Sequence, residues 1–319
     1  MKKSYFILFF TVCLSLISYA QNTVEEEIEL YAKPANLYGT ILCPDSNLGV
    51  VALIISGSGP TDRDGNSAGM SKNNSLKYLA EDLSKQGIAS LRIDKRGVGK
   101  SLSAMKSENE LTFDVYIDDI INWGYKILND RRFKKLVIIG HSEGSLVGMA
   151  ATKELEKELN VLGYVSLAGA GYPIDEVIMK QLKTLPDSIQ NNAKIIFEKL
   201  KNDEKIKKVD PNLISLFRPS IQNYMASWVK LNPKELIKEV NAPILIVNGT
   251  TDIQVPIDNA EALHAANPKS EMVIVEGMNH VFKEAPADRE ENIKTYTNPD
   301  LKNMPKLADS IVNFIKSNL

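Results

Sequence analysis

The sequence predicts an α/β fold with a mostly parallel central sheet of about eight strands, helices on both faces and an inserted helical cap. Apolar segments rich in Val, Ile and Leu recur along the chain, as expected for strands buried on both faces. Helical patterns separate these segments, and the alternation indicates a doubly wound sheet with right-handed crossovers. The expected strands are 37–44, 49–59, 88–97, 134–142, 161–171, 242–252 and 271–280.

The helices expected between the strands follow from apolar residues at helical spacing. One stretch, 172–239, breaks the alternation because it is charged, helical in pattern and without a strand-like run. We therefore expect an α/β core formed by residues 21–171 and 240–319, with 172–239 inserted as a helical cap. The helices expected in the core are 76–86, 113–129, 142–159, 259–266 and 306–319.

Aromatic side chains give the predicted cap its own apolar stripe. Tyr224 and Trp228 lie four residues apart, which puts them on one face of a helix. This spacing indicates that they pack inside the cap, where they would also be placed to cover a substrate pocket. The lysine-rich run at 197–210 is interpreted as the solvated face of a cap helix.

The N-terminal 20 residues have the layout of a secretory signal peptide. Lys2 and Lys3 precede an apolar run that is short for a membrane span, and Ser18 and Ala20 flank a cleavage point before Gln21. We expect export to the periplasm or the exterior, without stable membrane insertion after cleavage; the alternative is an uncleaved N-terminal anchor.

The composition argues against some partners and against an internal disulfide. The chain has 319 residues, 44% of them hydrophobic, and a formal net charge of −2. That charge provides no broad basic field, so nucleic acid is not an expected partner. Cleavage after residue 20 would leave Cys43 as the sole cysteine, and a small buried apolar residue is its expected role.

A serine between two glycines marks the expected nucleophile. In "KKLVIIGHSEGSLVGMA", Ser142 follows an apolar strand and precedes a helix with small residues. Gly140 and Gly144 permit strand and helix to approach closely while the serine adopts a strained turn. The serine hydroxyl would then lie at a helix N-terminus, where backbone N–H groups can stabilise a developing oxyanion.

The nucleophile needs a base, and the chain offers three histidines. His280 follows the strand-like run "EMVIVEG" at 271–277 and should reach the sheet edge that carries Ser142. His141 precedes the serine in the same turn and should point away from it, as a structural or pocket-lining residue. His264 lies within a predicted helix and is expected at the surface. His280 is therefore the expected base.

A carboxylate must orient that histidine. Asp252 follows the strand-like run "PILIVNG" at 243–249 and reaches the same sheet edge. Asp258 lies farther along, towards the next helix, and Glu276 still belongs to its strand, so both are placed less well. The resulting chain order is serine, aspartate, histidine, which is typical of nucleophile-elbow hydrolases.

These three motifs, in this order, resemble the α/β-hydrolase superfamily over nearly the whole chain after residue 20. The loops "SGSGPTDRDGN" and "LRIDKRGVGKS" are similar to those of secreted bacterial carboxylesterases in the serine-aminopeptidase-like group. The resemblance implies an oxyanion hole made by the backbone N–H groups of Glu143 and Ser58, with Gly59 as the next candidate. Many lipases and esterases have histidine where this chain has Ser56.

The loop that carries the oxyanion donor also contains Asp62, Arg63 and Asp64. We interpret these residues as parts of a turn held by internal hydrogen bonds and ion pairs rather than as catalytic acids or metal ligands. Arg96 lies in a loop expected at the same edge, and we expect it to pair with an aspartate of this turn and brace the oxyanion backbone.

No cofactor or metal site is expected. "GVGKS" lacks the first glycine of a P-loop, because Asp94 occupies that position, and "GSGPTD" has Asp62 where a dinucleotide fingerprint needs its third glycine. Histidine and cysteine do not cluster with metal-ligand spacing.

The expected function is hydrolysis of small carboxylic esters by Ser142, His280 and Asp252 through an acyl-enzyme. Glu143 is interpreted as a complement to the helix dipole, or alternatively as a contact for a substrate amine or hydroxyl. The same three catalytic residues would also serve an aminopeptidase or amidase, or a thioesterase, which export disfavours. A non-catalytic binding module on the same fold is the alternative outside the enzyme class.

Overall fold

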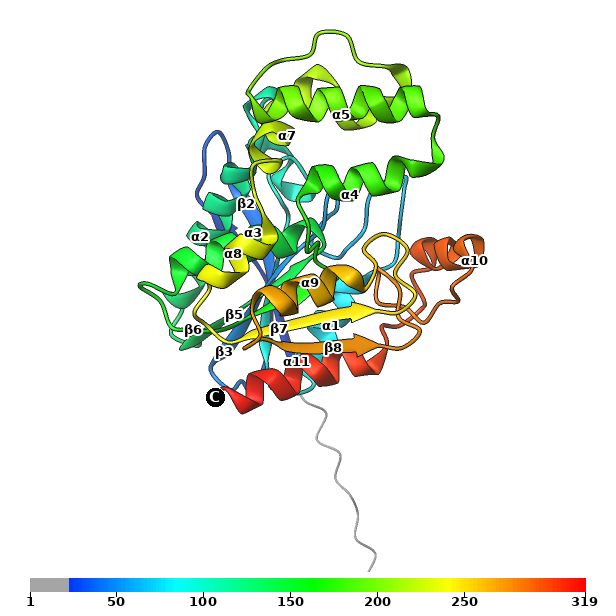
Figure 1. Ribbon diagram of the computed structural model, residues 1–319. Helices are drawn as coiled ribbons and strands as arrows, with labels where there is room; N and C mark the ends of the chain where they lie inside the picture. The colour runs from blue at the N-terminus through cyan, green and yellow to red at the C-terminus, as the bar shows by residue number, and fades with distance from the viewer. Residues whose placement is uncertain (1–22) are drawn as a thin grey trace, which may run out of the picture.

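The computed structural model describes residues 23–319, so the predicted signal peptide at 1–20 lies outside the described residues. The centre of the protein is one eight-stranded sheet with the order β1-β2-β4-β3-β5-β6-β7-β8 (Figure 1). All neighbouring strands from β4 to β8 run parallel, which confirms the predicted mostly parallel sheet of about eight strands. The strands are β1 (Thr23–Leu30), β2 (Leu37–Pro44), β3 (Val50–Ile55), β4 (Ala89–Ile93), β5 (Lys135–His141), β6 (Val161–Leu167), β7 (Ile244–Gly249) and β8 (Glu271–Val275).

Strand β1 has no counterpart among the predicted strands. It pairs antiparallel with β2 over its whole length and forms one edge of the sheet. Its sequence, TVEEEIEL, contains four glutamates, and all of its residues are exposed or only half-buried. An apolar run marks a buried strand, whereas an exposed edge strand is commonly charged because charge discourages pairing with other chains.

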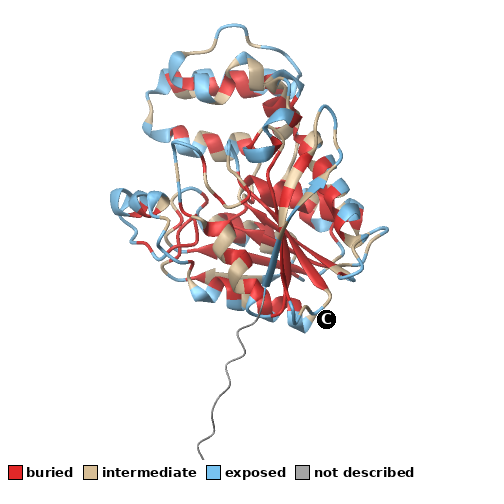
Figure 2. Ribbon diagram, turned by 180° about the vertical axis from the view of Figure 1, so that it is seen from behind, coloured by how far each residue is buried: buried red, intermediate tan, exposed pale blue. Residues whose placement is uncertain are grey.

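Helices cover both faces of the sheet (Figure 1). Helices α1 (Ser75–Ser84) and α11 (Pro305–Ser317) pack on one face in a common apolar cluster. Helices α2 (Phe113–Leu128), α3 (Glu143–Leu155) and α9 (Asp258–Ala266) cover the other face. All five were predicted, although α3 ends four residues earlier than expected. Figure 2 shows the buried residues concentrated in the sheet between these two layers.

Between β6 and β7 the described chain forms helices and loops without a strand. We call residues 172–239 the cap segment; it rises above the sheet, and α5 and the loop that follows it lie farthest from the sheet (Figure 1). Its lysine-rich run at 197–210 is not one helix face, because α5 ends at Lys201 and a loop follows. The α-helices of the cap segment are α4 (Ile174–Gln181), α5 (Asp187–Lys201), α6 (Ile214–Phe217), α7 (Gln222–Trp228) and α8 (Pro233–Leu236).

Aromatic contacts join the cap segment to the core. Within the cap segment, the rings of Phe197 and Phe217 meet edge to face at 4.9 Å. Two side chains of α7 stack on Phe113 of α2, Trp228 at 5.3 Å and Tyr224 at 5.9 Å. Such stacked pairs add to the free energy gained by apolar burial and fix α7 against α2. No helix of residues 23–319 is long and apolar enough to span a membrane.

Candidate active site

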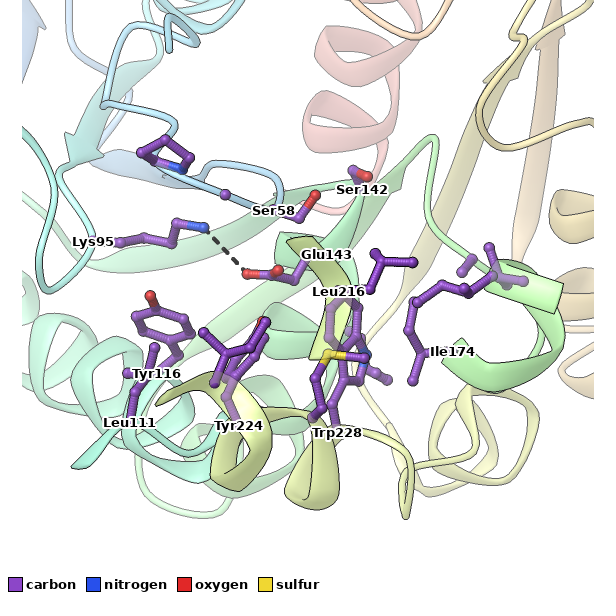
Figure 3. Close-up of a pocket in the computed structure, with 18 of the residues that line it drawn as sticks. Ser58, Lys95, Leu111, Tyr116, Ser142, Glu143, Ile174, Leu216, Tyr224 and Trp228 are labelled. Atoms are coloured by element: carbon purple, nitrogen blue, oxygen red, sulfur yellow. Dashed lines mark hydrogen bonds and ion pairs between the residues drawn. The ribbon is translucent and has the colours of Figure 1, made fainter. Parts of the chain in front are cut away.

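Ser142 occupies the sharp turn between β5 and α3. Its backbone has φ 55° and ψ −119°, a conformation that non-glycine residues rarely adopt. The Ser142 N–H donates to the carbonyl of Leu167 at the end of β6, which fixes the turn to the neighbouring strand. The serine hydroxyl makes no hydrogen bond to another described residue, and the side chain lines a cavity (Figure 3). It is therefore available to a bound substrate.

The glycines around Ser142 allow a very close approach of backbone segments. A Cβ on Gly140 would lie 2.2 Å from the carbonyl oxygen of Gly144, and one on Gly144 would lie 2.6 Å from the carbonyl oxygens of Ile55 and Ser56. Real Cβ atoms do not approach backbone atoms so closely, so no side chain fits at either position without a backbone shift. The strand–turn–helix geometry that exposes Ser142 thus requires both glycines.

Three backbone N–H groups near Ser142 have no acceptor within the described part of the chain. They belong to Glu143, at the first position of α3, and to Ser58 and Gly59 in the loop after β3. All three residues line the same cavity as Ser142. This arrangement can donate hydrogen bonds to an oxyanion formed next to the serine.

His280 and Asp252 come together through a hydrogen bond. The Nδ1 atom of His280 lies 2.8 Å from Oδ2 of Asp252, and both side chains are buried. The other carboxylate oxygen, Oδ1, accepts hydrogen bonds from the N–H groups of Gln254 and Val255 at 2.8 and 2.9 Å. The aspartate is thereby held in one orientation and fixes the imidazole, whose Nε2 remains for another partner.

His280 does not hydrogen-bond to Ser142 within the described residues. It is connected to the serine turn through His141, whose Nε2 lies 2.9 Å from the His280 carbonyl oxygen and whose ring lies 4.7 Å from that of His280. Catalytic hydrogen bonds are often long in the absence of substrate and shorten when it binds.

His141 has a structural role in this arrangement. Burial and the neighbouring His280 lower the pKa of His141 to about 3, so its ring is neutral. Since a carbonyl oxygen only accepts, the neutral ring carries its proton on Nε2 and donates it to His280. His141 thus ties the serine turn to the histidine loop and has the structural role of the two that were expected, since it is not among the residues that line the cavity.

The rival residues occupy other environments. Asp258 pairs with Lys180 on the surface, and Glu276 is exposed in the turn after β8. His264 is half-buried on α9 and its Nδ1 lies 3.0 Å from the hydroxyl of Ser270. None of these three side chains contacts His280 or Ser142 through a hydrogen bond or ion pair.

The turn at 62–64 is held by its own polar contacts, as expected. Oδ1 of Asp62 accepts two backbone N–H bonds within the turn. Arg63 forms a buried ion pair of 2.7 Å with Asp94, directly after β4, and Asp64 pairs with Arg92 of that strand. These contacts hold the loop that carries Ser58 and Gly59 against β4.

The expectation for Arg96 is wrong. Its guanidinium pairs with Asp119 of α2 at 2.6 Å and also donates to the Ala104 carbonyl, so it does not contact the aspartates of the turn. The preceding residue, Lys95, reaches the oxyanion loop instead, and its Nζ donates to the Gly57 carbonyl at 2.5 Å. The sequence therefore predicts correctly that a cation of this loop contacts the oxyanion loop. The cation is Lys95 and not Arg96, because successive side chains of an extended segment point in opposite directions.

Lys95 also forms a buried ion pair with Glu143, at 3.2 Å between Nζ and Oε1 (Figure 3). The contact joins β4 and the oxyanion loop to the first turn of α3. The sequence indicates a role for Glu143 at the helix dipole or towards substrate but not this pair, because the partners lie 48 residues apart.

The cavity beside Ser142 has a volume of about 550 Å³. In Figure 3 it extends from Ser142 and Ser58, past Glu143, to the side chains of Tyr224 and Trp228 in the cap segment. Most of its wall is apolar, with Leu111 of the core and Ile174 and Leu216 of the cap segment among the contributors. A cavity of this size and character suits a small organic molecule.

Among residues 23–319, no group of three or more His, Cys, Asp or Glu side chains is arranged to hold a metal ion.

Comparison with known protein families identifies the chain. The profile of the serine aminopeptidase S33 family matches residues 69–284. The chain belongs to this family. The matched range contains Ser142, Asp252 and His280, together with the cap segment, and begins after the loop with Ser58 and Gly59.

A curated protein that is similar to this chain is esterase EstD of Thermotoga maritima. The two proteins are 29% identical over 210 residues, which is 64% of this chain and 46% of that protein. The match thus spans about half the length of the relative.

Solved structures with the same fold include esterases and a peptidase. Est1E of Butyrivibrio proteoclasticus, solved with ferulic acid, has a TM-score of 0.60 and 17% identity over 91% of this chain and 98% of that chain. The esterase Pf2001 of Pyrococcus furiosus has a TM-score of 0.56 and 16% identity, covering 92% and 93%. Proline iminopeptidase of Mycobacterium smegmatis has a TM-score of 0.58 and 10% identity, covering 92% and 98%. These likenesses confirm the α/β-hydrolase fold.

The Lys95–Glu143 pair predicts a stability effect. Replacing Lys95 with methionine would leave the Glu143 carboxylate without its buried counter-ion, and we expect the free energy of unfolding at neutral pH to fall by about 3 kcal/mol. Urea denaturation measures this change. The control is Lys85→Met, which removes an exposed pair with Asp82 and should change stability by less than about 0.5 kcal/mol. Equal effects in the two variants would contradict a structural role for the buried pair.

A second buried lysine lies in the loop that carries His280. Lys283 is 0% exposed; its Nζ donates to Oδ1 of Asn303 at 2.9 Å and lies 4.8 Å from the ring centre of Tyr78. Burial, assisted by the nearby Lys302, lowers its pKa to about 7. In the unfolded chain the pKa of a lysine is about 10.4.

This difference predicts how stability depends on pH. Between pH 7 and pH 10 the unfolded state binds the proton more strongly than the folded state, so the free energy of unfolding should rise with pH relative to a Lys283→Met variant. The rise should be on the order of 1 kcal/mol per pH unit. Urea denaturation of both proteins across this range measures it, and a constant difference between them would contradict the lowered pKa.

Proposed function

We propose that this protein is a serine hydrolase that cleaves carboxylic esters through an acyl-enzyme intermediate. The observation that carries the proposal is the 2.8 Å hydrogen bond between His280 and Asp252 at the sheet edge that carries Ser142. A strained serine turn, an oriented imidazole and unpaired backbone donors are the components that acyl transfer requires.

In the proposed mechanism, Oγ of Ser142 attacks the ester carbonyl while Nε2 of His280 takes its proton. Asp252 holds the imidazole with Nδ1 protonated and stabilises the imidazolium that forms. The N–H groups of Glu143 and Ser58, or Gly59, hydrogen-bond to the oxyanion. His280 then protonates the leaving alcohol, and water releases the acid by the same steps in reverse.

The names of relatives favour an ester over an amide substrate. EstD, the relative with 29% identity, is named an esterase, and so is one of the similar structures. The family name and the similar proline iminopeptidase support aminopeptidase activity as the second candidate. A thioester substrate would use the same three residues.

The purified protein tests the proposal directly. We expect a fluorophosphonate probe to label Ser142, as located by mass spectrometry of the labelled peptide, and p-nitrophenyl acetate to be hydrolysed. Aminoacyl p-nitroanilides should be poorer substrates by kcat/KM. Faster cleavage of the anilides would assign the protein to the aminopeptidases, whereas absence of both labelling and turnover would favour a non-catalytic binding module.

The proposal includes a cap and export. The cap segment supplies much of the cavity wall, which supports its role as a cover for the substrate. The charged and apolar pattern at 1–20 supports removal of a signal peptide in the producing cell. A mature protein that begins at Gln21 is the expected result of N-terminal sequencing.

A further inference from the structure

Besides the ion pair Glu108–Arg218, the mostly apolar wall of the cavity beside Ser142 contains a polar cluster around Glu143. It consists of the buried pair Lys95–Glu143 and the two tyrosines Tyr116 and Tyr224, all of which line the cavity (Figure 3). The oxyanion hole uses only the backbone N–H of Glu143, so the side chains of this cluster have no part in the proposed chemistry. We call these four side chains the polar cluster.

Tyr224 of the polar cluster has an unsatisfied hydroxyl. The residue is 9% exposed and its oxygen is covered from solvent, yet it has no hydrogen-bond partner among residues 23–319. Burial and the nearby Glu143 carboxylate raise the pKa of Tyr224, so the group keeps its proton and can donate it. Buried hydroxyls almost always have a partner, and one without a partner requires an explanation.

Other polar atoms of the cluster are also unpaired. Oε1 of Glu143 is occupied by Lys95, whereas Oε2 accepts no hydrogen bond from the described residues. The Tyr116 hydroxyl likewise has no hydrogen bond within residues 23–319, and its ring lies 5.2 Å from Nζ of Lys95. The cluster therefore offers one free carboxylate oxygen and two hydroxyls to a molecule in the cavity.

The charge of the cluster selects between an ammonium group and a hydroxyl as ligand. Lys95 lies 3.2 Å from Glu143 and neutralises it, so a second cation placed there would be repelled by the lysine at short range. A hydroxyl can donate to Glu143 and accept from Tyr224 without adding charge. A purely apolar group offers neither of these hydrogen bonds.

We propose that the polar cluster is a subsite for a hydroxyl group of the ester substrate. This inference rests on the proposed esterase function and deepens it: the protein would select esters that carry a neutral hydroxyl some distance from the reacting carbonyl, in preference to alkyl esters and to esters that carry an amine.

Matched ester series test the subsite. In the first series, methyl esters of straight-chain acids of graded length are compared with their ω-hydroxy and ω-amino counterparts. In the second series, acetates of alcohols are compared with acetates of the corresponding diols. The two series together place the hydroxyl on the acid side and on the alcohol side of the ester. At one chain length we expect the hydroxy ester to exceed its alkyl counterpart in kcat/KM by about tenfold or more.

The variant Tyr224→Phe should reduce this ratio to near or below one. Tyr125→Phe is the matched control, since it removes the same hydroxyl from an exposed site on α2 where the partner is Glu158; it should retain the ratio of the unmodified protein.

The outcomes separate the two proposals. Hydrolysis of the alkyl esters with no hydroxy preference at any length, or with a preference for the ω-amino esters, would overturn the subsite while leaving the esterase function in place. A hydroxy preference that survives Tyr224→Phe would also overturn it. If no ester is hydrolysed and the serine probe fails to label Ser142, the proposed function fails and the subsite with it.

Discussion

Replacing Ser142 with alanine is expected to lower kcat/KM for ester hydrolysis by about 10⁴- to 10⁶-fold. The change removes the oxygen that attacks the carbonyl, whereas the oxyanion donors and the cavity remain. The backbone strain at φ 55° should stay the same, because alanine, like serine, has a Cβ. The free energy of unfolding should therefore change little, so loss of activity can be assigned to chemistry. Turnover of p-nitrophenyl acetate and urea denaturation measure the two quantities.

Ser103→Ala is the control for this variant. Ser103 is exposed and lies outside the cavity, so the same change there should leave kcat/KM within about twofold. Residual labelling of the Ser142→Ala protein by a fluorophosphonate would mean that another residue is the nucleophile.

The fold was largely predictable because its signals are local. Fully buried strands such as β3 and β5 are continuous apolar runs, and the helices between them have one apolar face. Strand β1 was missed since its glutamates face solvent and its position depends on pairing with β2, which no local pattern encodes.

The chain order and the sheet edge also predicted which residues approach each other in the site. Asp252 and His280 follow neighbouring parallel strands, so their contact follows from topology. The contact of Lys95, by contrast, depends on which of two adjacent cations reaches the oxyanion loop, and the sequence alone favoured Arg96. The unsatisfied hydroxyl of Tyr224 could not be predicted either, because it results from packing between the cap segment and the core.

Replacing Asp252 with asparagine is expected to lower kcat/KM by about 10⁴-fold without unfolding the protein. The reason lies in the two backbone donors: Oδ1 accepts from the N–H groups of Gln254 and Val255. In the asparagine variant only the amide oxygen can keep these bonds, so the amide nitrogen must face His280. That nitrogen donates to Nδ1 of His280, so the neutral imidazole must carry its proton on Nε2. Nε2 is the atom that has to be unprotonated to accept the proton of Ser142.

The variant therefore retains a correctly placed histidine in the wrong tautomer, which distinguishes this prediction from a general loss of structure. Nitrogen NMR of labelled histidine should report the change from an Nδ1–H to an Nε2–H form of His280, and kcat/KM measured in parallel should fall with it. Asp258→Asn provides the control, because Asp258 pairs with Lys180 at the surface and does not contact His280. A decrease of less than about tenfold for Asp252→Asn, with the Nε2–H tautomer present, would mean that His280 is not the base that activates Ser142.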